Sequence, residues 1–423
     1  MTSLCQRLSR LLNSQAASLW SELLYREMGV QETDPPAYVS SINFSCEAKR
    51  RFFDWRMKFK EFSNEEIKFV VTWWQRMENW LGQHAPSVLN SLHPPANSDE
   101  FHLFASRIKY PLPRLLRLFY SFHNGQASYP QDRRRNPHCL FGGYDVYNES
   151  VYHQFLSVQD MMAITLNIGA EQHIQRCYVV DIHSSYTKDK QRKPVGNLAI
   201  FVASLASPKF ICCNDENIFT HLDRFDIFVP CVQTNSANSR LPPLFQWLQE
   251  YLTRLELGVF RYEPIDLTNP IAVEDSDLRR ISLFAYSNNS ALSHGIEVSP
   301  SPLFIPSLSS STGELFFAYN IRMSAIPDRM QSKSLQLARR HWRIYSGGQE
   351  EVVDGEGVIG LFPLFERQRV VAHPFAYQSC TRITPPGAMA GTFDFIIGSL
   401  NDPQGEVQVK VPQFELSVPS FIF

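Results

Sequence analysis

The spacing of apolar residues divides the chain into three parts, and the first part is short. Within residues 1–30, Leu4, Leu8, Leu11 and Leu12 follow the i, i+4, i+7, i+8 pattern of a single helix face. After a break, Trp20, Leu23, Leu24 and Met28 form a second helical stripe. Two helices of this size cannot enclose a core. We therefore expect them to pack on the rest of the chain or on a partner.

A second part, residues 60–257, combines long helices with short apolar runs. Ser63 and Glu66 have the spacing of a capping box, which predicts that a helix begins there. Short apolar runs between Cys177 and Pro230 predict buried strands, and residues 241–258 predict a closing amphipathic helix. This combination indicates an α+β domain. The stripe that follows Ser63 consists of Ile67, Val70, Val71, Trp74, Met77 and Leu81.

In the third part, residues 294–423, the helical period gives way to a period of two. Apolar residues at 317, 319, 321 and 323 alternate with Ala318, Asn320 and Arg322, which predicts a strand with one buried and one exposed face. Several such strands, separated by turns and without a helix, predict a β-sandwich. Residues 31–59 are expected to be a helical connector, and residues 258–293, which are rich in Asn, Ser and Asp, a linker. The chain as a whole is predicted to be a multidomain α+β protein.

Three glycines in the third part have the spacing of a phosphate-binding loop. Gly355, Gly357 and Gly360 read G-x-G-x-x-G, and a predicted strand precedes them. The fingerprint requires a helix to begin at the glycines, so that free backbone N–H groups face a pyrophosphate. Pro363 and the absence of a helical period after it argue against that helix. A tight turn between sandwich strands is the preferred interpretation, and a nucleotide-binding enzyme is the alternative.

Composition and charge exclude several classes of function. The chain has 423 residues, of which 44% are hydrophobic and 19% are charged, and its net charge of −2 does not suggest nucleic acid as a partner. No run of about 18 apolar residues predicts a membrane span, and residues 1–15 lack the apolar core of a signal peptide. The eight cysteines include no C-x-x-C pair. We therefore expect an intracellular protein, in the cytoplasm or nucleus or both, without a metal or other cofactor.

The third part also carries recognisable motifs. "LARRHWRI", "EVVDGEGVIGLFPLF", "FAYQSCT", "PPGAMAGTFDF" and "VKVPQFEL" occur in this order, and the segment 294–423 resembles the ApaG domain. This resemblance implies a fibronectin-III-like sandwich that takes part in protein recognition, and the glycine turn is part of the family pattern. Arg339 and Arg340 are expected to form a basic edge beside that turn. Together with Gly355, Gly357 and Gly360, they are the candidates for contact with a substrate.

Two further resemblances precede the ApaG-like segment. "YPLPRLLRLFYSFHNGQ" and "FGGYDVYNESVYH" are similar to the SMI1/KNR4 domain, an α+β interaction module, over about residues 60–257. "SLCQRLSRLLNSQAASLWSELLYRE" resembles the C-terminal half of an F-box. The order of the three segments is that of the ApaG-containing F-box proteins. This implies a substrate receptor that binds the Skp adaptor and, through it, cullin in a ubiquitin ligase. The implied adaptor-binding residues are Leu4, Leu8, Leu11, Leu12, Leu19 and Trp20.

The F-box resemblance is incomplete, which leaves alternatives open. The L-P segment and first helix of the motif do not precede Met1. The stripe from Leu4 to Trp20 could therefore bind the adaptor, or it could pack on the SMI1/KNR4-like domain. We expect a receptor without catalytic residues, because other subunits of such a ligase carry out the ubiquitin chemistry. The alternative is an interaction scaffold without ligase association.

Overall fold

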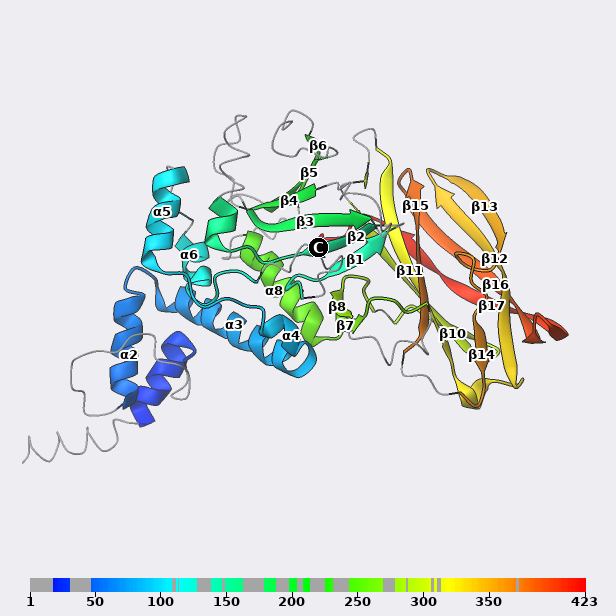
Figure 1. Cartoon of the computed structure of the whole chain (residues 1–423), viewed down its shortest axis with the longest axis horizontal. Helices are drawn as coiled ribbons and strands as arrows, with labels where there is room; N and C mark the ends of the chain where they lie inside the picture. The colour runs from blue at the N-terminus through cyan, green and yellow to red at the C-terminus, as the bar shows by residue number, and fades with distance from the viewer. Residues whose placement is uncertain are drawn as a thin grey trace, which may run out of the picture. The chain divides into compact units, whose positions relative to one another are not determined.

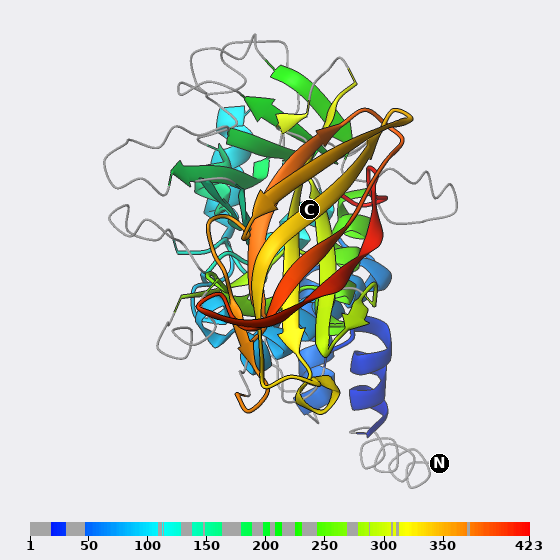
Figure 2. The ribbon, with the colours of Figure 1, turned by 90° about the vertical axis from the view of Figure 1, so that its right-hand side faces the viewer.

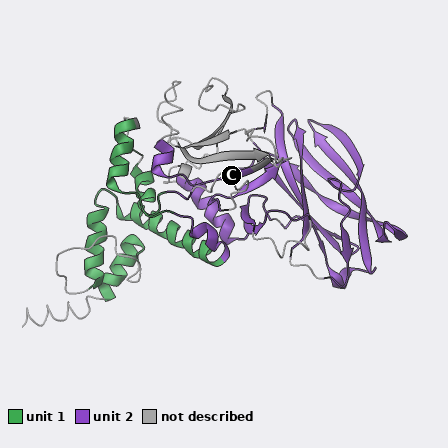
Figure 3. Cartoon of the chain, viewed as in Figure 1, with its two compact units in different colours: residues 1–83, 93–124 green, residues 84–92, 125–423 purple. Residues whose placement is uncertain are grey.

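The computed structural model divides into two compact units, which Figure 3 distinguishes by colour. The first unit comprises residues 1–83 and 93–124, and the second comprises residues 84–92 and 125–423. This division differs from the expected domain boundaries, which stay predictions. The structure describes residues 18–30, 47–108, 112, 114–127, 138–146, 149–162, 179–187, 198–203, 208–213, 225–230, 243–268, 278–286, 288–305, 308–309, 313–369 and 373–423.

The regular secondary structure described in the first unit is helical. Its core is aromatic, since Trp73 and Trp74 pack edge to face with ring centroids 4.9 Å apart and Phe119 lies against both. The indole nitrogen of Trp74 donates to the carbonyl of Phe119 at 3.1 Å, so this large ring is buried without an unpaired donor. The helices are one over 18–28, α2 (Glu47–Lys58), α3 (Asn64–His84), α5 (Ser98–Ile108) and α6 (Arg114–Tyr120).

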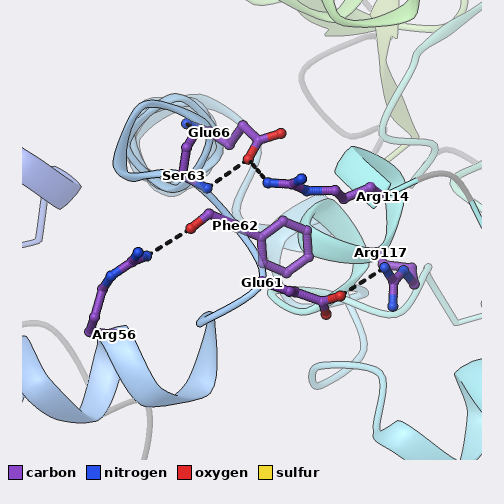
Figure 4. A network of polar contacts seen from close by, with 7 residues as sticks. All are labelled: Arg56, Glu61, Phe62, Ser63, Glu66, Arg114 and Arg117. Carbon is purple, nitrogen blue, oxygen red and sulfur yellow. Dashed lines mark hydrogen bonds and ion pairs between the residues drawn. The ribbon is translucent and has the colours of Figure 1, made fainter.

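The start of α3 confirms the predicted capping box. The backbone N–H of Ser63 donates to Glu66 Oε2 at 2.7 Å, and that of Glu66 donates to Ser63 Oγ at 3.2 Å (Figure 4). The Glu66 carboxylate also pairs with Arg114 at the start of α6, and Arg117 pairs with Glu61 at 2.9 Å. The cap therefore does more than begin a helix, because it also connects α3 to α6. All six residues of the predicted stripe, Ile67, Val70, Val71, Trp74, Met77 and Leu81, are buried.

The second unit contains an eight-stranded sheet in the order β6-β5-β4-β3-β2-β1-β8-β7. Helix α8 (Pro243–Glu256), predicted from its stripe, packs against the chain just before β1: Trp247 lies 5.4 Å from the ring of Phe141, and the Tyr251 hydroxyl donates to the carbonyl of Leu140 (Figure 1). Residues 258–293, expected as a linker, contribute two of the strands. The strands are β1 (Gly143–Val146), β2 (Glu149–His153), β3 (Val179–Thr187), β4 (Leu198–Ala203), β5 (Pro208–Cys213), β6 (Phe225–Pro230), β7 (Arg261–Pro264) and β8 (Arg279–Ser282).

The same unit contains the predicted β-sandwich, which faces the viewer in Figure 2. Trp342 fills its core between Tyr319 and Phe393, with ring centroids 5.9 and 5.6 Å away. One sheet has the order β15-β11-β10-β9 and the other β13-β12-β16-β17, with β14 paired to β12. The strands are β9 (Ala291–Ser293), β10 (Ile296–Phe304), β11 (Leu315–Ala325), β12 (Ser334–Ser346), β13 (Gln349–Glu356), β14 (Leu364–Glu366), β15 (Phe375–Ile383), β16 (Gly387–Ser399) and β17 (Asp402–Leu416).

Strand β11 corrects the expectation of one exposed face. Ala318, Asn320 and Arg322 were predicted to face solvent, but they are only 0%, 1% and 4% exposed. The reason is that the α+β part of the unit covers this face of the sheet. Arg322 donates to the Glu263 carboxylate on β7 at 3.2 Å and to the carbonyl of Phe284 at 3.0 Å. A second buried ion pair, Arg280–Asp145 at 3.1 Å, lies within the covering sheet.

The last residue, Phe423, also connects the sandwich strand β17 to the α+β part. Its ring lies 5.1 Å from Trp247 and 5.3 Å from Phe260, and the Arg254 guanidinium stands 4.7 Å over it. Beside it, the Trp247 indole donates to the carbonyl of Ile422 at 2.7 Å. The Phe423 side chain is therefore part of the core, and the residue is only 5% exposed.

Replacing Phe423 with alanine should destabilise the second unit. The change leaves a cavity between Trp247 and Phe260, so we expect a loss of about 3 kcal/mol in the free energy of unfolding. Urea unfolding followed by tryptophan fluorescence measures this loss. Phe421→Ala is the matched control, because that ring is only half-buried and should cost far less. Equal losses for the two variants would show that Phe423 does not hold α8.

The Arg322–Glu263 pair should behave as a coupled unit. Glu263→Gln leaves a buried guanidinium unpaired, and Arg322→Met leaves a buried carboxylate unpaired, so each single change should cost about 3 kcal/mol or more. The double variant removes both charges and should cost clearly less than the sum of the single losses. A double-mutant cycle by urea unfolding measures the difference, and strictly additive losses would contradict the pairing.

Candidate functional site

The glycine stretch forms a tight turn at the end of β13. Val358 and Leu361 exchange two backbone hydrogen bonds, of 2.9 and 2.8 Å. Between them, Ile359 and Gly360 both have positive φ, 47° and 77°, which is the arrangement of a type I′ turn. The short strand β14 follows, not a helix. No helix N-terminus is therefore directed at the glycines, and the preferred turn interpretation is confirmed.

A backbone contact requires glycine at position 357, and the lack of a side chain at Gly355 leaves room for a neighbouring side chain. A Cβ on Gly355 would lie 2.7 Å from the Arg340 guanidinium, and one on Gly357 would lie 2.6 Å from the Leu361 carbonyl. The Arg340 guanidinium uses this space to donate to the carbonyls of Glu356 and Gly357, at 3.0 and 2.8 Å. Arg340 therefore braces the turn, whereas Arg339, its neighbour on β12, is exposed.

Of the six proposed adaptor-binding residues, the structure describes Leu19 and Trp20. Leu4, Leu8, Leu11 and Leu12 lie outside the described residues. On the helix over 18–28, the Trp20 ring packs 5.5 Å from Phe52 and 5.8 Å from Phe53 of α2, so it already has an internal role. Leu19, by contrast, is 55% exposed. Of the two described members of the set, Leu19 is exposed and Trp20 is partly buried.

Burial and neighbouring charges shift the pKa values of residues in and beside the two buried ion pairs. Burial opposes the charge of Arg280, but Asp145, Tyr152 and Glu263 together outweigh this effect and raise the pKa of Arg280. The Tyr286 hydroxyl donates to Glu263 at 2.7 Å, and burial together with that carboxylate raises the pKa of Tyr286 to about 12. These side chains were missed from the sequence, because nothing near Asn320 and Arg322 indicates which segment will cover them.

A histidine on the outer face of the other sheet lies between two carboxylates. His341 Nδ1 is 2.7 Å from Asp354 Oδ1, and its Nε2 is 2.5 Å from Asp394 Oδ2. These hydrogen bonds, first that to Asp394 and then that to Asp354, raise the pKa of His341. His341 therefore faces away from Trp342 and the core. Its partners are accounted for, and among the described residues no group of histidine, cysteine or acidic side chains is arranged to hold a metal.

Cys380 is the cysteine of the sandwich sheets, and it lies on a different sheet from His341. On β15 it lies opposite Ala318, on the face turned away from the core residue Tyr319. His341 lies on the outer face of the opposite sheet. A cysteine nucleophile requires a nearby base or a lowered pKa, and the two sheets keep these side chains apart.

His341 should make the stability of the sandwich depend on pH. Because its folded pKa is raised above the ordinary value of 6.5, its contribution is complete below pH 6.5 and is lost as the pH rises through the raised value. Urea unfolding between pH 5 and 9 should show this decline, and His341→Gln should flatten it. His373→Gln is the matched control. An unchanged pH profile in His341→Gln would contradict the assignment.

The chain matches one protein family and several curated proteins. Residues 307–397 match the ApaG domain. The F-box protein SKIP16 of Arabidopsis thaliana is 26% identical over 97% of this chain and 92% of its own length. The mouse F-box only protein 3 is 24% identical over 87% of this chain and 69% of its own length.

The C-terminal segment also matches a free-standing protein. Protein ApaG of Methylocella silvestris is 32% identical over 134 residues, which is 31% of this chain and 93% of that protein. The match to the SMI1/KNR4 domain stays a resemblance. No helix among the described residues is long and apolar enough to cross a membrane. Through its C-terminal sandwich the chain belongs to the ApaG family, and its relatives over nearly the full length are F-box proteins.

Proposed function

We propose that the chain is the substrate-recognition subunit of a Skp–cullin–F-box ubiquitin ligase. The observation that carries this proposal is the match to an F-box protein over 97% of the chain, a span that includes both the helical N-terminal part and the sandwich. In this role the chain presents a substrate and performs no ubiquitin chemistry itself. The place of action is the cytoplasm, the nucleus or both.

The helix over 18–28 supplies one structural support for the adaptor contact. Its buried side, Leu24 and Met28, is fully enclosed, so the helix has a fixed orientation. Leu19 remains exposed on it, and Phe53 and Met57 of the neighbouring α2 are 39% and 65% exposed. Exposed apolar side chains on adjoining helices are typical of a protein-binding surface. We assign the adaptor contact to this part of the chain, together with Leu4, Leu8, Leu11 and Leu12.

The second unit supplies the substrate-binding part in this proposal. The part of the SMI1/KNR4-like segment after residue 124 shares one compact unit with the ApaG-like segment. Within that unit the ion pair between Arg322 and Glu263 joins the sandwich to β7. A rigid body of this kind can hold a bound segment in one position relative to the ligase. Arg339, Gly355, Gly357 and Gly360 stay candidates for substrate contact. The braced Arg340 is assigned to support of the turn.

Capture of the Skp adaptor and cullin tests the proposal. The endogenous protein and the chain starting at Met1 should both bring down the adaptor, and Leu19→Glu should weaken capture by roughly tenfold or more, because it places a charge in an apolar contact. Leu400→Glu is the matched control, because Leu400 is 42% exposed in the sandwich. Immunoblotting of the captured material gives the readout.

Each failure of this experiment has a specific meaning. If neither form of the protein captures the adaptor, the receptor proposal is wrong and an interaction scaffold without ligase association takes its place. If capture occurs but Leu19→Glu and Leu400→Glu have equal effects, the helix over 18–28 is not the contact surface. The ligase role would then stand with a different adaptor-binding surface.

A further inference from the structure

The second unit has a cleft where the outer face of one sandwich sheet meets β1, β7 and β8. Its volume is about 440 Å³, which is large enough for a side chain or a small ligand. A backbone hydrogen bond of 2.9 Å from Ala376 to the Leu267 carbonyl closes one wall. The charged and amide side chains that line the cleft are Asp145, Glu263, Asp266, Arg280, Asn320 and Gln378.

The sandwich side of the cleft presents unpaired acceptors. Asn320 on β11 and Gln378 on β15 lie directly opposite each other in the register, and both line the cleft. Asn320 is 1% exposed, and neither its Oδ1 nor the Oε1 of Gln378 has a hydrogen-bond partner. Unsatisfied buried oxygens are costly in a folded protein. Two of them, side by side on neighbouring strands, point to a ligand that donates hydrogen bonds.

The charge of the lining favours a cationic donor. The cleft has three carboxylates, on Asp145, Glu263 and Asp266, and one guanidinium, on Arg280. Arg280 is paired with Asp145 at 3.1 Å, and Glu263 is paired with Arg322, which does not line the cleft. The remaining carboxylate, Asp266, is exposed at the rim. A cation would therefore meet acceptors inside the cleft and an uncompensated negative charge at its entrance.

The rim also contains an apolar residue in an unusual conformation. Ile359, on the glycine turn, lines the cleft and is 53% exposed, with a φ of 47°. A β-branched residue rarely adopts this left-handed conformation, and such outliers occur preferentially at functional sites. An exposed isoleucine at the entrance can pack against the methylene stem of a long side chain whose charged end lies deeper.

We propose that this cleft binds an arginine side chain of a substrate segment, with its guanidinium donating to Asn320 Oδ1 and Gln378 Oε1. A planar guanidinium has five donors in a fixed fork, which suits two acceptors on adjacent strands better than the point charge of lysine does. Asp266 attracts the cation at the rim, and Ile359 packs on its stem. The inference rests on the proposed function, because it assigns the substrate contact of the same receptor.

The direct test is binding of a single arginine to the full chain. We would titrate N-acetyl-arginine amide by calorimetry and expect millimolar affinity, as a ligand of this size allows. The neutral isostere N-acetyl-citrulline amide should bind about tenfold or more weakly, because a charge-assisted hydrogen bond is lost. This comparison uses the unaltered protein, so it does not depend on the folding of a variant. Equal affinity for the two compounds would overturn the proposal.

Three variants locate the site. Asn320→Leu and Gln378→Leu should each weaken binding of the arginine probe by about tenfold, whereas Gln413→Leu, on β17 of the other sheet, should leave it unchanged. Asp266→Asn keeps the side-chain cap on Thr268 but removes the rim charge, so affinity should fall a few-fold and lose part of its salt dependence. If Gln378→Leu and Asp266→Asn both bind as the unaltered chain does, the cleft is not the site.

Two further measurements distinguish this inference from a small-metabolite site and from the receptor proposal. Free arginine, with its charged α-groups, should bind no better than the amide, and a clear preference for it would replace the substrate segment with a small metabolite. Adaptor capture is measured on the same preparation. Capture without arginine binding would reject the cleft and leave the receptor role intact. Arginine binding without capture would reject the receptor role and leave the cleft intact.

Discussion

The second unit depends on one buried interaction, the pairing of Arg322 with Glu263. Arg322 extends from the middle of a sandwich strand into the α+β part, where the carboxylate, the Phe284 carbonyl and the Tyr286 ring surround it. A buried guanidinium is very costly unless it is paired. Burying this sheet face against a surface that lacks such a carboxylate would therefore be unfavourable. The pair thus fixes which surface covers the sheet, although it need not add much to stability.

Because the pair selects the surface that covers the sheet, polar residues on this face of the sandwich are also buried. Ser301, Asn320 and Gln378 lie opposite one another across three strands, and on an isolated sandwich water would satisfy them. Covering the sheet removes bulk water, and the unpaired oxygens of Asn320 and Gln378 remain in the lining of a cleft. Apolar residues at these three positions would pack more closely against the covering part of the unit. The polar row therefore has a cost for folding that a bound ligand would offset.

Much of the architecture could be predicted from the sequence, because local patterns determined it. The capping box at Ser63 was predictable since both partners lie within one helical turn, and Trp342 was predictable as core from its alternation with Ile344. The burial of Asn320 and Arg322 was not, because their cover, β7 and β8, comes from residues 258–293, which have the composition of a linker. Periodicity reports one face of a strand, and it carries no information on a distant segment that covers the other.

The glycine stretch shows that a local pattern can also suggest a site that the fold does not form. A spacing associated with nucleotides arises here from three separate causes: room for the Arg340 guanidinium at Gly355, a close carbonyl at Gly357 and a left-handed turn at Gly360. None of these requires a phosphate, and only the element that follows, β14 in place of a helix, distinguishes the two cases. The turn nevertheless has a consequence for binding, because it holds Ile359 in a conformation that its side chain disfavours. The glycines therefore act on the cleft indirectly: they position its rim, while the contacts with a ligand fall to the polar residues of β11 and β15.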